Sequence, residues 1–314
     1  MLIIESIPEI KDINKSVITI GNFDGLHKGH QVLINETINY AKKYNLKSIV
    51  FTFSNHPINY FMDDKIKNIL KTKQKMQILN DMGVDIVINI PFNELMTQIP
   101  AEQFVSEILK NKLGLKKIII GHDFSFGRNK EGNGKLLKIL SKKYMYDIDI
   151  IEPIKIDGIR VSSSIIRELI ENGNITKASE YLGRNYKISG KVIQSKQLGR
   201  QIGFPTANIR CNKDILIPKR GIYATKVKVD NKEYIGATNI GYNPTVEGKE
   251  LSVETHILNF DKDIYGEILS VEFLERIRDE RKFESLEKLI IQLEKDTRYI
   301  KEKYICKNKI NMIK

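Results

Sequence analysis

Cysteine is scarce in this chain of 314 residues, and long apolar runs are absent from it. The two cysteines, Cys211 and Cys306, are too few for a disulfide framework and are typical of a reducing compartment. No apolar run approaches the length of a membrane span, and the N-terminus lacks the basic start and apolar core of a signal peptide. We therefore expect a soluble, cytoplasmic protein without a membrane partner, for which a weak homo-oligomer is allowed.

The chain is strongly basic. Lys and Arg number 51 against 39 Asp and Glu, which gives a formal net charge of +12. These basic residues are scattered rather than clustered, and no RNA-binding aromatic signature accompanies them. Phosphorylated small molecules explain the charge better than nucleic acid, so no nucleic-acid partner is expected. The length allows one large or two ordinary domains.

The most informative stretch is residues 21–30, Gly-Asn-Phe-Asp-Gly-Leu-His-Lys-Gly-His. A β-branched apolar run at 17–20 precedes it and a helical pattern follows, so it is the turn of a strand–turn–helix unit. Glycines allow close approach to a ligand, and the helix start offers free N–H groups and positive dipole to an anion. His27 and His30 lie on one side of the first turn, where they can donate to phosphate oxygens. The alternative is a Gly-rich turn with incidental histidines, and two histidines alone fall short of a zinc site.

Up to about residue 182, strand-like runs alternate with helical patterns. This alternation predicts an α/β, Rossmann-like domain with a mostly parallel sheet covered on both faces. The expected strands are 17–20, 48–53, 86–90, 117–120 and 148–151, and the expected helices are 73–82, 101–112 and 135–144.

Polar loops follow two of these strands, and a third polar segment lies further along. Asn55, His56 and Pro57 follow the second strand and Asp123 follows the fourth, so we expect them to line one crevice at the carboxyl edge of the sheet. Taken singly, each loop is also ordinary turn material.

The segment Arg-Val-Ser-Ser-Ser-Ile-Ile-Arg at 160–167 suggests a second phosphate cradle. Ser162, Ser163 and Ser164 stand at a helix start, and Arg167 follows one turn later to neutralise a triphosphate. The alternative is a serine-capped helix with an exposed arginine. Together with residues 21–30, this order of motifs resembles the nucleotidyltransferase superfamily, whose members transfer a nucleotide monophosphate from a nucleoside triphosphate.

The pattern changes after Gly183, which is typical of a helix end. We place the domain junction there, with domains at 1–184 and 185–314. Period-two runs joined by short loops then predict an antiparallel barrel or sandwich. A helix from about residue 285 to 304, with Ser285 as N-cap, is expected to pack on it.

A second candidate site lies at residues 199–208, Gly-Arg-Gln-Ile-Gly-Phe-Pro-Thr-Ala-Asn. Thr206 and Asn208 supply hard oxygen ligands of the kind that magnesium prefers, although Pro and Asn also make ordinary turns. Glu254 sits inside a strand-like run, where alternation alone leaves a solvent-facing or a pocket position open.

Four runs in this half resemble riboflavin kinase: residues 199–208, 239–245, 253–257 and 263–266, with Arg278 and the terminal helix pattern also similar. Joined to the N-terminal motifs, nearly the whole chain resembles the bifunctional bacterial riboflavin kinase/FMN adenylyltransferase family (FAD synthetase). The resemblance implies a six-stranded barrel in the second domain, phosphorylation of riboflavin to FMN, and adenylylation of FMN to FAD, with ATP, riboflavin and FMN as substrates and Mg²⁺ as cofactor.

The resemblance also implies residue roles. Glu254 is the expected base for the riboflavin 5′-hydroxyl, and Thr206 and Asn208 are expected at magnesium and phosphate. His27, His30 and Arg167 are the expected catalytic residues of adenylyl transfer. The other candidates for ATP or phosphate binding are Gly21, Phe23, Asp24, Gly25, Gly29, Ser162, Ser163, Ser164, Gly199, Arg200 and Gly203. The candidates for flavin binding are Asn55, His56, Pro57, Asp123 and Arg278.

Two positions depart from the family pattern: Ser195 stands where glycine is frequent and Asn243 where arginine is frequent. Two other hypotheses about the function stay open. One is a nucleotidyltransferase with a different acceptor, and the other is a nucleic-acid-binding protein with an oligonucleotide-binding barrel.

Overall fold

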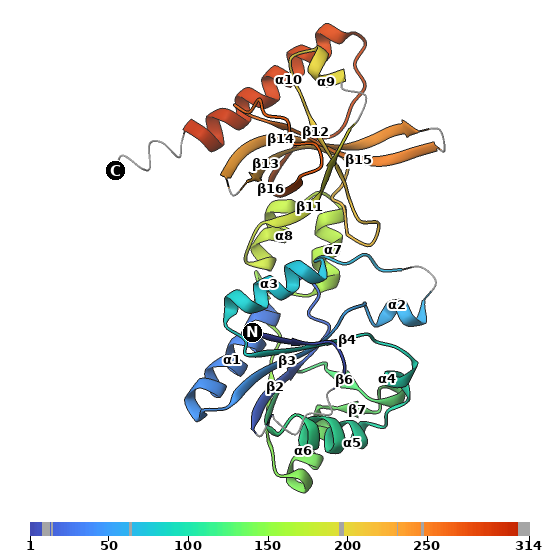
Figure 1. Cartoon of the computed structure of the whole chain (residues 1–314), viewed down its shortest axis with the longest axis vertical. Coiled ribbons are helices and arrows are strands. Elements are labelled where there is room, and N and C mark those ends of the chain that lie inside the picture. Colours follow the sequence, from blue (N-terminus) through green and yellow to red (C-terminus); the bar gives the residue numbers. More distant parts are fainter. Residues whose placement is uncertain are drawn as a thin grey trace. The chain divides into compact units, whose positions relative to one another are not determined.

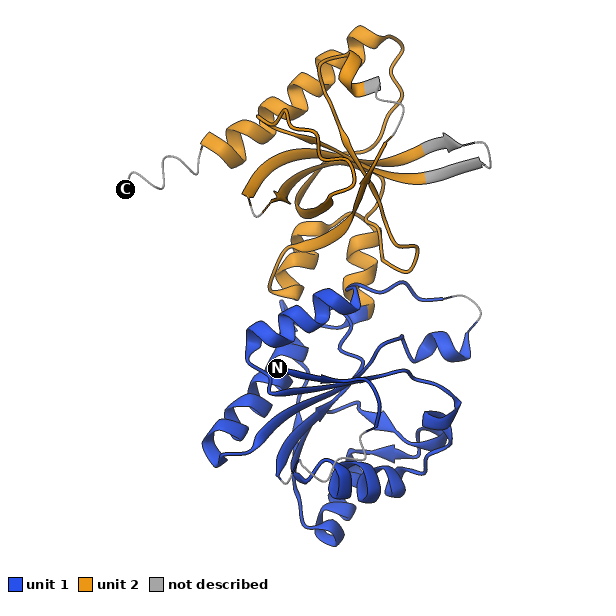
Figure 2. Cartoon of the chain, in the orientation of Figure 1, with its two compact units in different colours: residues 1–163 blue, residues 164–314 orange. Residues whose placement is uncertain are grey.

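The computed structural model describes residues 1–7, 13, 15–62, 65–194, 198–230, 232–245 and 248–306, with side chains except at 198, 243–245 and 248–250. Ser195, the side chain of Asn243 and the tail 307–314 therefore lie outside the described part. The chain divides into two compact units, residues 1–163 and 164–314 (Figure 2).

The first unit is built on a six-stranded, entirely parallel sheet (Figure 1). This arrangement confirms the predicted Rossmann-like architecture. Its strands, in spatial order, are β1 (Leu2–Ile4), β4 (Ile86–Ile90), β3 (Lys47–Phe53), β2 (Ser16–Ile20), β5 (Leu115–Gly121) and β8 (Asp147–Ile151). The edge strand β1 was not predicted, because three residues carry no readable period.

Strand alternation divides the core of this unit between the two sheet faces. Val17, Val50 and Val87 pack with α1 (Lys28–Tyr44) and α3 (Thr72–Met82). Ile18, Ile49 and Ile86 pack on the other face. The helices there are α5 (Ala101–Gln103), its π-helical continuation η1 (Phe104–Lys112), and α6 (Gly134–Tyr144). The predicted helices are confirmed within a few residues.

Short elements fill the loops of the first unit. They are α2 (Ile58–Phe61), α4 (Glu94–Gln98), η2 (Arg128–Lys130), the ribbon of β6 (Ser125–Phe126) with β7 (Gly132–Asn133), and the ribbon of β9 (Lys155–Ile156) with β10 (Ile159–Arg160).

The second unit contains a closed barrel of six antiparallel strands, as predicted (Figure 1). The strands, in order around the barrel, are β11 (Tyr186–Ile193), β12 (Ala207–Arg210), β15 (Gly248–Ile257), β14 (Lys232–Thr245), β13 (Gly221–Val229) and β16 (Ile268–Arg278). Three buried threonines on neighbouring strands are linked through their hydroxyls. The Oγ1 atoms of Thr225 and Thr238 lie 2.8 Å apart, and those of Thr238 and Thr255 lie 2.9 Å apart. Each hydroxyl therefore satisfies the next inside the barrel.

Three segments complete the second unit: α9 (Leu198–Gln201), α10 (Leu286–Lys301) and its π-helical end η3 (Glu302–Cys306). The predicted N-cap is confirmed, since the Ser285 hydroxyl accepts from the Lys288 N–H at 3.3 Å. Ile300 of α10 is fully buried against Ala224 and Leu258. The helix thus packs on the barrel, as expected from its apolar stripe.

Helices α7 (Ser163–Glu171) and α8 (Ile175–Leu182) precede the barrel. Most of α7 and all of α8 belong to the second compact unit, where the Lys219 N–H donates to the Ile170 carbonyl at 3.2 Å. The junction expected at residue 184 was placed where a helix ends. The compact units divide earlier, after residue 163, because that division depends on which residues the helices contact. In the described residues, no helix is long and apolar enough to cross a membrane.

Candidate active sites

The loop after β2 has a strained backbone. Gly25 has φ 83°, and the non-glycine residues Phe23 and Leu26 have φ 49° and 42°. Such conformations cost on the order of 1–3 kcal/mol each in ordinary residues. Phe23 and Leu26 are at most 1% exposed and belong to the core beneath α1. Burial of these two side chains therefore holds the loop in its shape.

His27 and His30 form a stacked pair at the start of α1. His27 is the N-cap, and its Nδ1 accepts from the His30 N–H at 3.3 Å. The two rings are 3.6 Å apart and nearly parallel, while Phe23 meets His30 edge-on at 5.2 Å. A Cβ at Gly29 would come within 3.2 Å of the His27 ring, so glycine gives this ring its space.

Both imidazoles line a pocket of about 270 Å³ in the first unit. Its walls come from the loops after β2, β5 and β8 and from the segment before α7, which agrees with the expected convergence at the carboxyl ends of parallel strands. The sequence-predicted residues that line it are Gly21, Phe23, His27, Gly29, His30, Asp123, Ser162 and Ser163.

An ion pair crosses this pocket. Asp123 forms a hydrogen-bonded salt bridge with Arg160, and His122 Nδ1 lies 3.8 Å from the same carboxylate. Burial alone would raise the pKa of Asp123, but the hydrogen bond and charge of Arg160 outweigh it and lower that pKa. Arg160 is therefore a pocket cation that the sequence analysis did not single out.

Asp24 and Gly25 do not line the pocket. The Asp24 carboxylate is 5% exposed and accepts from the Ile69 N–H at 3.0 Å, while its carbonyl accepts from the Ser163 hydroxyl at 2.8 Å. These bonds tie the motif loop to two other segments of the first unit. Ser164 and Arg167 belong to the second compact unit, so their part in this pocket stays a prediction.

The loop with Asn55, His56 and Pro57 also lies outside the lining. The Asn55 amide pairs with the backbone of Phe92 at 2.7 and 2.9 Å, and His56 Nδ1 accepts from the Ile58 N–H at 3.3 Å. Beside them is an aromatic group that the sequence analysis missed. Its members are Phe53, Tyr60, Phe61 and Phe92, which contact one another edge-to-face, with Phe61 65% exposed.

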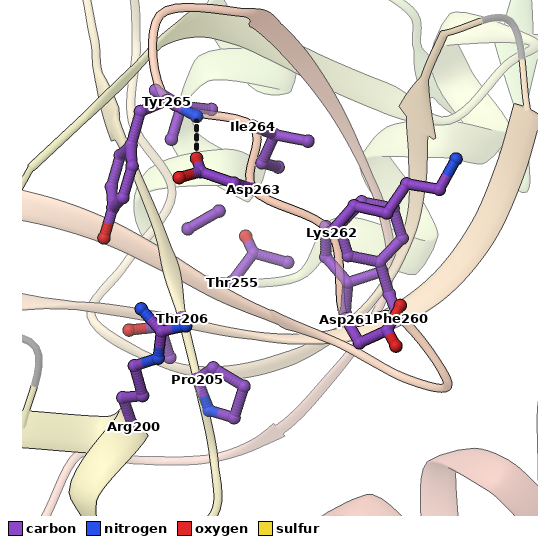
Figure 3. A pocket seen from close by; sticks show the side chains of 13 residues that line it. Arg200, Pro205, Thr206, Thr255, Phe260, Asp261, Lys262, Asp263, Ile264 and Tyr265 are labelled. Atoms are coloured by element: carbon purple, nitrogen blue, oxygen red, sulfur yellow. Dashed lines mark hydrogen bonds between the residues drawn. The ribbon is translucent and has the colours of Figure 1, made fainter.

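A pocket of about 280 Å³ opens in the second unit (Figure 3). Thr206 and Arg200 face it from one side, and residues 260–265 form the other. Within that segment the Tyr265 N–H donates to the Asp263 carboxylate at 2.9 Å (Figure 3). Thr255, from the row of barrel threonines, also reaches this pocket.

The loop that carries Thr206 is folded tightly. The Phe204 N–H donates to the Gly199 carbonyl at 2.8 Å, and a Cβ at Gly199 would lie only 2.3 Å from the Phe204 carbonyl oxygen. Gly203 closes the turn at φ 85°. Only glycine at 199 permits this close approach, so the predicted importance of these two glycines has a steric reason.

Asn208 and Glu254 are register partners on β12 and β15, and Glu254 pairs in turn with Asn239 on β14. Side chains opposite one another in neighbouring strands lie on one face of the sheet. Asn208 is 5% exposed, and Asn239 Oδ1 is buried without a hydrogen-bond partner in the described part of the chain. Asn208 and Glu254 stand outside the lining of the Thr206 pocket, on the neighbouring row of the barrel wall.

The donors near Thr206 suit magnesium. Thr206 and Asn208 offer a hydroxyl and an amide oxygen, both hard neutral ligands. Asn239, two strands along from Asn208, adds a buried amide oxygen with no hydrogen-bond partner among the described residues. The described residues contain no cluster of three His, Cys, Asp or Glu side chains that could hold a metal alone. These oxygens therefore fit a magnesium ion whose other ligands come largely from the phosphates of the substrate.

Arg278 was predicted to bind the flavin. In the structure its side chain forms an ion pair with Asp296. Arg278 Nε and Nη2 donate to Oδ2 of Asp296 on α10, at 2.9 and 2.7 Å, and Nε also donates to Oδ1 at 3.2 Å. The side chains of Arg278 and Asp296 are 17% and 5% exposed. The pair clamps α10 to the barrel, and a role at the flavin stays a prediction.

His256 was not assigned a role from the sequence. Its Nδ1 lies 2.8 Å from the Pro205 carbonyl oxygen, and its ring meets Phe204 edge-on at 5.3 Å. The carbonyl can only accept, so Nδ1 carries the proton. His256 thus supports the residue directly before Thr206.

Comparison with known proteins accounts for both halves of the chain. A family model described as FAD synthetase matches residues 9–165, and one described as riboflavin kinase matches residues 182–304. The chain is similar to the bifunctional riboflavin kinase/FMN adenylyltransferase of Haemophilus influenzae, with 37% identity over 89% of this chain and 91% of that protein. The corresponding Escherichia coli (strain K12) protein is 35% identical over 89% and 90%.

A solved structure also superposes over nearly the full length. It is described as a macrolide-efflux protein from Streptococcus pneumoniae, with 30% identity and a TM-score of 0.88 over 96% of this chain and 98% of that chain.

Proposed function

Because the chain belongs to the bifunctional riboflavin kinase/FMN adenylyltransferase family, we propose that its two reactions are divided between the two pockets, one in each compact unit. The enzyme phosphorylates riboflavin to FMN with ATP. It then joins FMN to AMP from a second ATP, which gives FAD and releases pyrophosphate. The reactions are those of the family, and the assignment of residues is the proposal.

The kinase reaction is assigned to the barrel. The observation that supports it is the position of Glu254 beside Asn208, one strand from the loop that carries Thr206. Thr206 and Asn208 hold Mg²⁺ and the ATP phosphates, and the ion supplies charge neutralisation on the transferred phosphoryl group. Glu254 accepts the proton of the riboflavin 5′-hydroxyl as the oxygen attacks the γ-phosphorus, and the bond from that phosphorus to the bridging oxygen breaks to release ADP.

Adenylyl transfer is assigned to the pocket around the stacked histidines. The attacking group is the FMN phosphate, which is ionised near neutral pH, so the site requires cations and hydrogen-bond donors rather than a strong base. The start of α1, His27 and His30 hold the triphosphate and stabilise the charge of the leaving pyrophosphate. The Asp123–Arg160 ion pair forms another part of the wall of this pocket.

The flavin ring of FMN is assigned to the aromatic group near Asn55. Phe61 and Tyr60 are exposed on it, and a flat isoalloxazine ring stacks well on such a surface. Because ATP and flavins are the substrates, a cytoplasmic enzyme that acts on small molecules follows from this proposal.

The proposal is tested with the purified chain, riboflavin, ATP and MgCl₂, with the flavins separated by chromatography over time. We expect FMN to appear first and FAD to follow, and both to need the metal. If FMN forms without Mg²⁺, the assigned role of Thr206 and Asn208 fails. If FAD does not form from added FMN, the assignment of the first pocket fails.

A further inference from the structure

A buried lysine joins three segments of the first unit beneath the motif loop. Lys75 lies on α3 and is 7% exposed. Its Nζ donates to the carbonyls of Asn22 and Phe53, at 3.2 and 2.9 Å, and to the Thr52 hydroxyl at 3.2 Å. Asn22 belongs to the loop after β2, and Thr52 and Phe53 end β3. One ammonium therefore links the ends of two neighbouring strands.

The number of donors matches the number of acceptors. An ammonium has three N–H groups and no acceptor, and three oxygens converge on it here. The Thr52 hydroxyl also donates to the Asn22 carbonyl at 3.0 Å, so the three groups form one closed cluster. An apolar side chain at this position would leave buried acceptors unsatisfied.

The same region of α3 holds the motif loop at a second point. Asp24, two residues after Asn22, accepts from the Ile69 N–H just before α3 begins. Between these two anchors stands Phe23, whose left-handed backbone directs its ring edge-on against His30. The Lys75 cluster therefore lies directly behind the residue that supports one imidazole of the pocket.

Burial of the Lys75 ammonium costs free energy, because the charged form loses its hydration. Burial lowers the pKa of Lys75 to about 8, against the smaller opposing effect of the Asp24 carboxylate. The ammonium thus remains mostly charged at neutral pH and loses its proton in mildly alkaline solution. The charge is buried where the loop after β2 meets the end of β3, and its three hydrogen bonds join these two segments.

We propose that Lys75 is a positioning residue for adenylyl transfer, acting by tying the Asn22 carbonyl to the end of β3 so that Phe23 and His30 keep their orientation. The inference depends on the proposed assignment of adenylyl transfer to the pocket around His27 and His30. It has no bearing on the kinase reaction, which the same chain provides as an internal control.

The test uses the full-length chain and follows FAD formation from FMN and FMN formation from riboflavin. In Lys75→Met we expect kcat for FAD formation to fall tenfold or more, with FMN formation within twofold of wild type. Lys73→Met, an exposed lysine on the same helix, is the matched control and should leave both rates unchanged. Wild-type kcat for FAD formation should decline as pH rises through about 8, and Lys75→Met should lack that decline.

A wild-type FAD rate that is flat from pH 7 to 9.5, relative to the FMN rate, overturns the inference without any variant. It is equally overturned if Lys75→Met forms FAD at the wild-type rate, or if both reactions fall together. His30→Ala separates the two hypotheses. If it leaves FAD formation intact, the assignment of the pocket is wrong; if it stops FAD formation while Lys75→Met does not, only the role of Lys75 is wrong.

Discussion

Asn208 and Glu254 are direct partners across β12 and β15, although they are far apart in the chain. Neither side chain lines the pocket that Thr206 reaches. Alternation along the strands places both on the sheet face opposite to Ala207 and Thr255, which do line it. In the proposed assignment, the ATP phosphates bind beside Thr206 and Asn208, and Glu254 meets the hydroxyl that accepts the phosphate.

Glu254→Gln should abolish most FMN formation. Glutamine keeps the size of the side chain and one acceptor oxygen but cannot take up the hydroxyl proton, and general bases contribute about 10²–10⁴-fold. The measurement is the rate of FMN formation from riboflavin, with FAD formation from added FMN expected unchanged. Glu233→Gln, at an exposed position on β14, serves as the control and should retain both activities. Full kinase activity in Glu254→Gln would falsify the assignment of the base.

His30→Ala should have the opposite effect. The substitution removes a donor at the start of α1 and the stacking partner of His27, so FMN should accumulate while FAD formation falls about 10²-fold or more. Flavin chromatography during turnover of riboflavin measures both products in one sample. Loss of both reactions would contradict independent sites.

His256→Phe should weaken ATP binding in the kinase reaction. Phenylalanine keeps the edge-on contact with Phe204 but loses the hydrogen bond to the Pro205 carbonyl, so the Thr206 loop is held less firmly. We expect the KM for ATP to rise several-fold with a smaller change in kcat. His256→Gln retains a donor and should recover part of the loss. An unchanged KM in His256→Phe would show that the loop needs no such support.

Asp296→Asn should destabilise the second unit. It removes the charge that neutralises Arg278 between β16 and α10, and an uncompensated buried charge costs about 3–5 kcal/mol. Thermal or denaturant unfolding of the full chain measures the effect. Asp214→Asn, at an exposed position, is the control and should unfold like the wild type.

The effect of pH on stability through Lys75 has a defined sign. Its pKa is lowered from 10.5 in the unfolded chain to about 8 in the folded one, so between these values the unfolded chain binds more protons. Wild type should therefore gain stability relative to Lys75→Met as pH rises from about 8 to 10.5. Melting curves of both proteins across this range give the difference. FAD formation should fall over the same range, so stability and activity should change in opposite directions.

The sequence alone determined the order of the elements and the family. Period-two and helical patterns predicted five of the six strands of the parallel sheet, the main helices beside it, and an antiparallel β domain with a terminal helix, because each pattern lies within one element and reports which side of it is buried. Ser285 was recognisable as an N-cap because a cap acts over three residues. The motif at 21–30 likewise lies within one strand–turn–helix unit.

Only the tertiary structure decided which distant residues meet. The pairing of Asn208 with Glu254, the cluster around Lys75 and the clamp between Arg278 and Asp296 each join different elements. Asp24 illustrates the limit: its carboxylate accepts from the Ile69 N–H, a contact that the motif did not indicate, and its part in phosphate binding stays a prediction. Strand register and sheet order determine such contacts, and no local period encodes them. The sequence thus identified the chemistry, and packing determined which side chains line the pockets and which hold other segments in place.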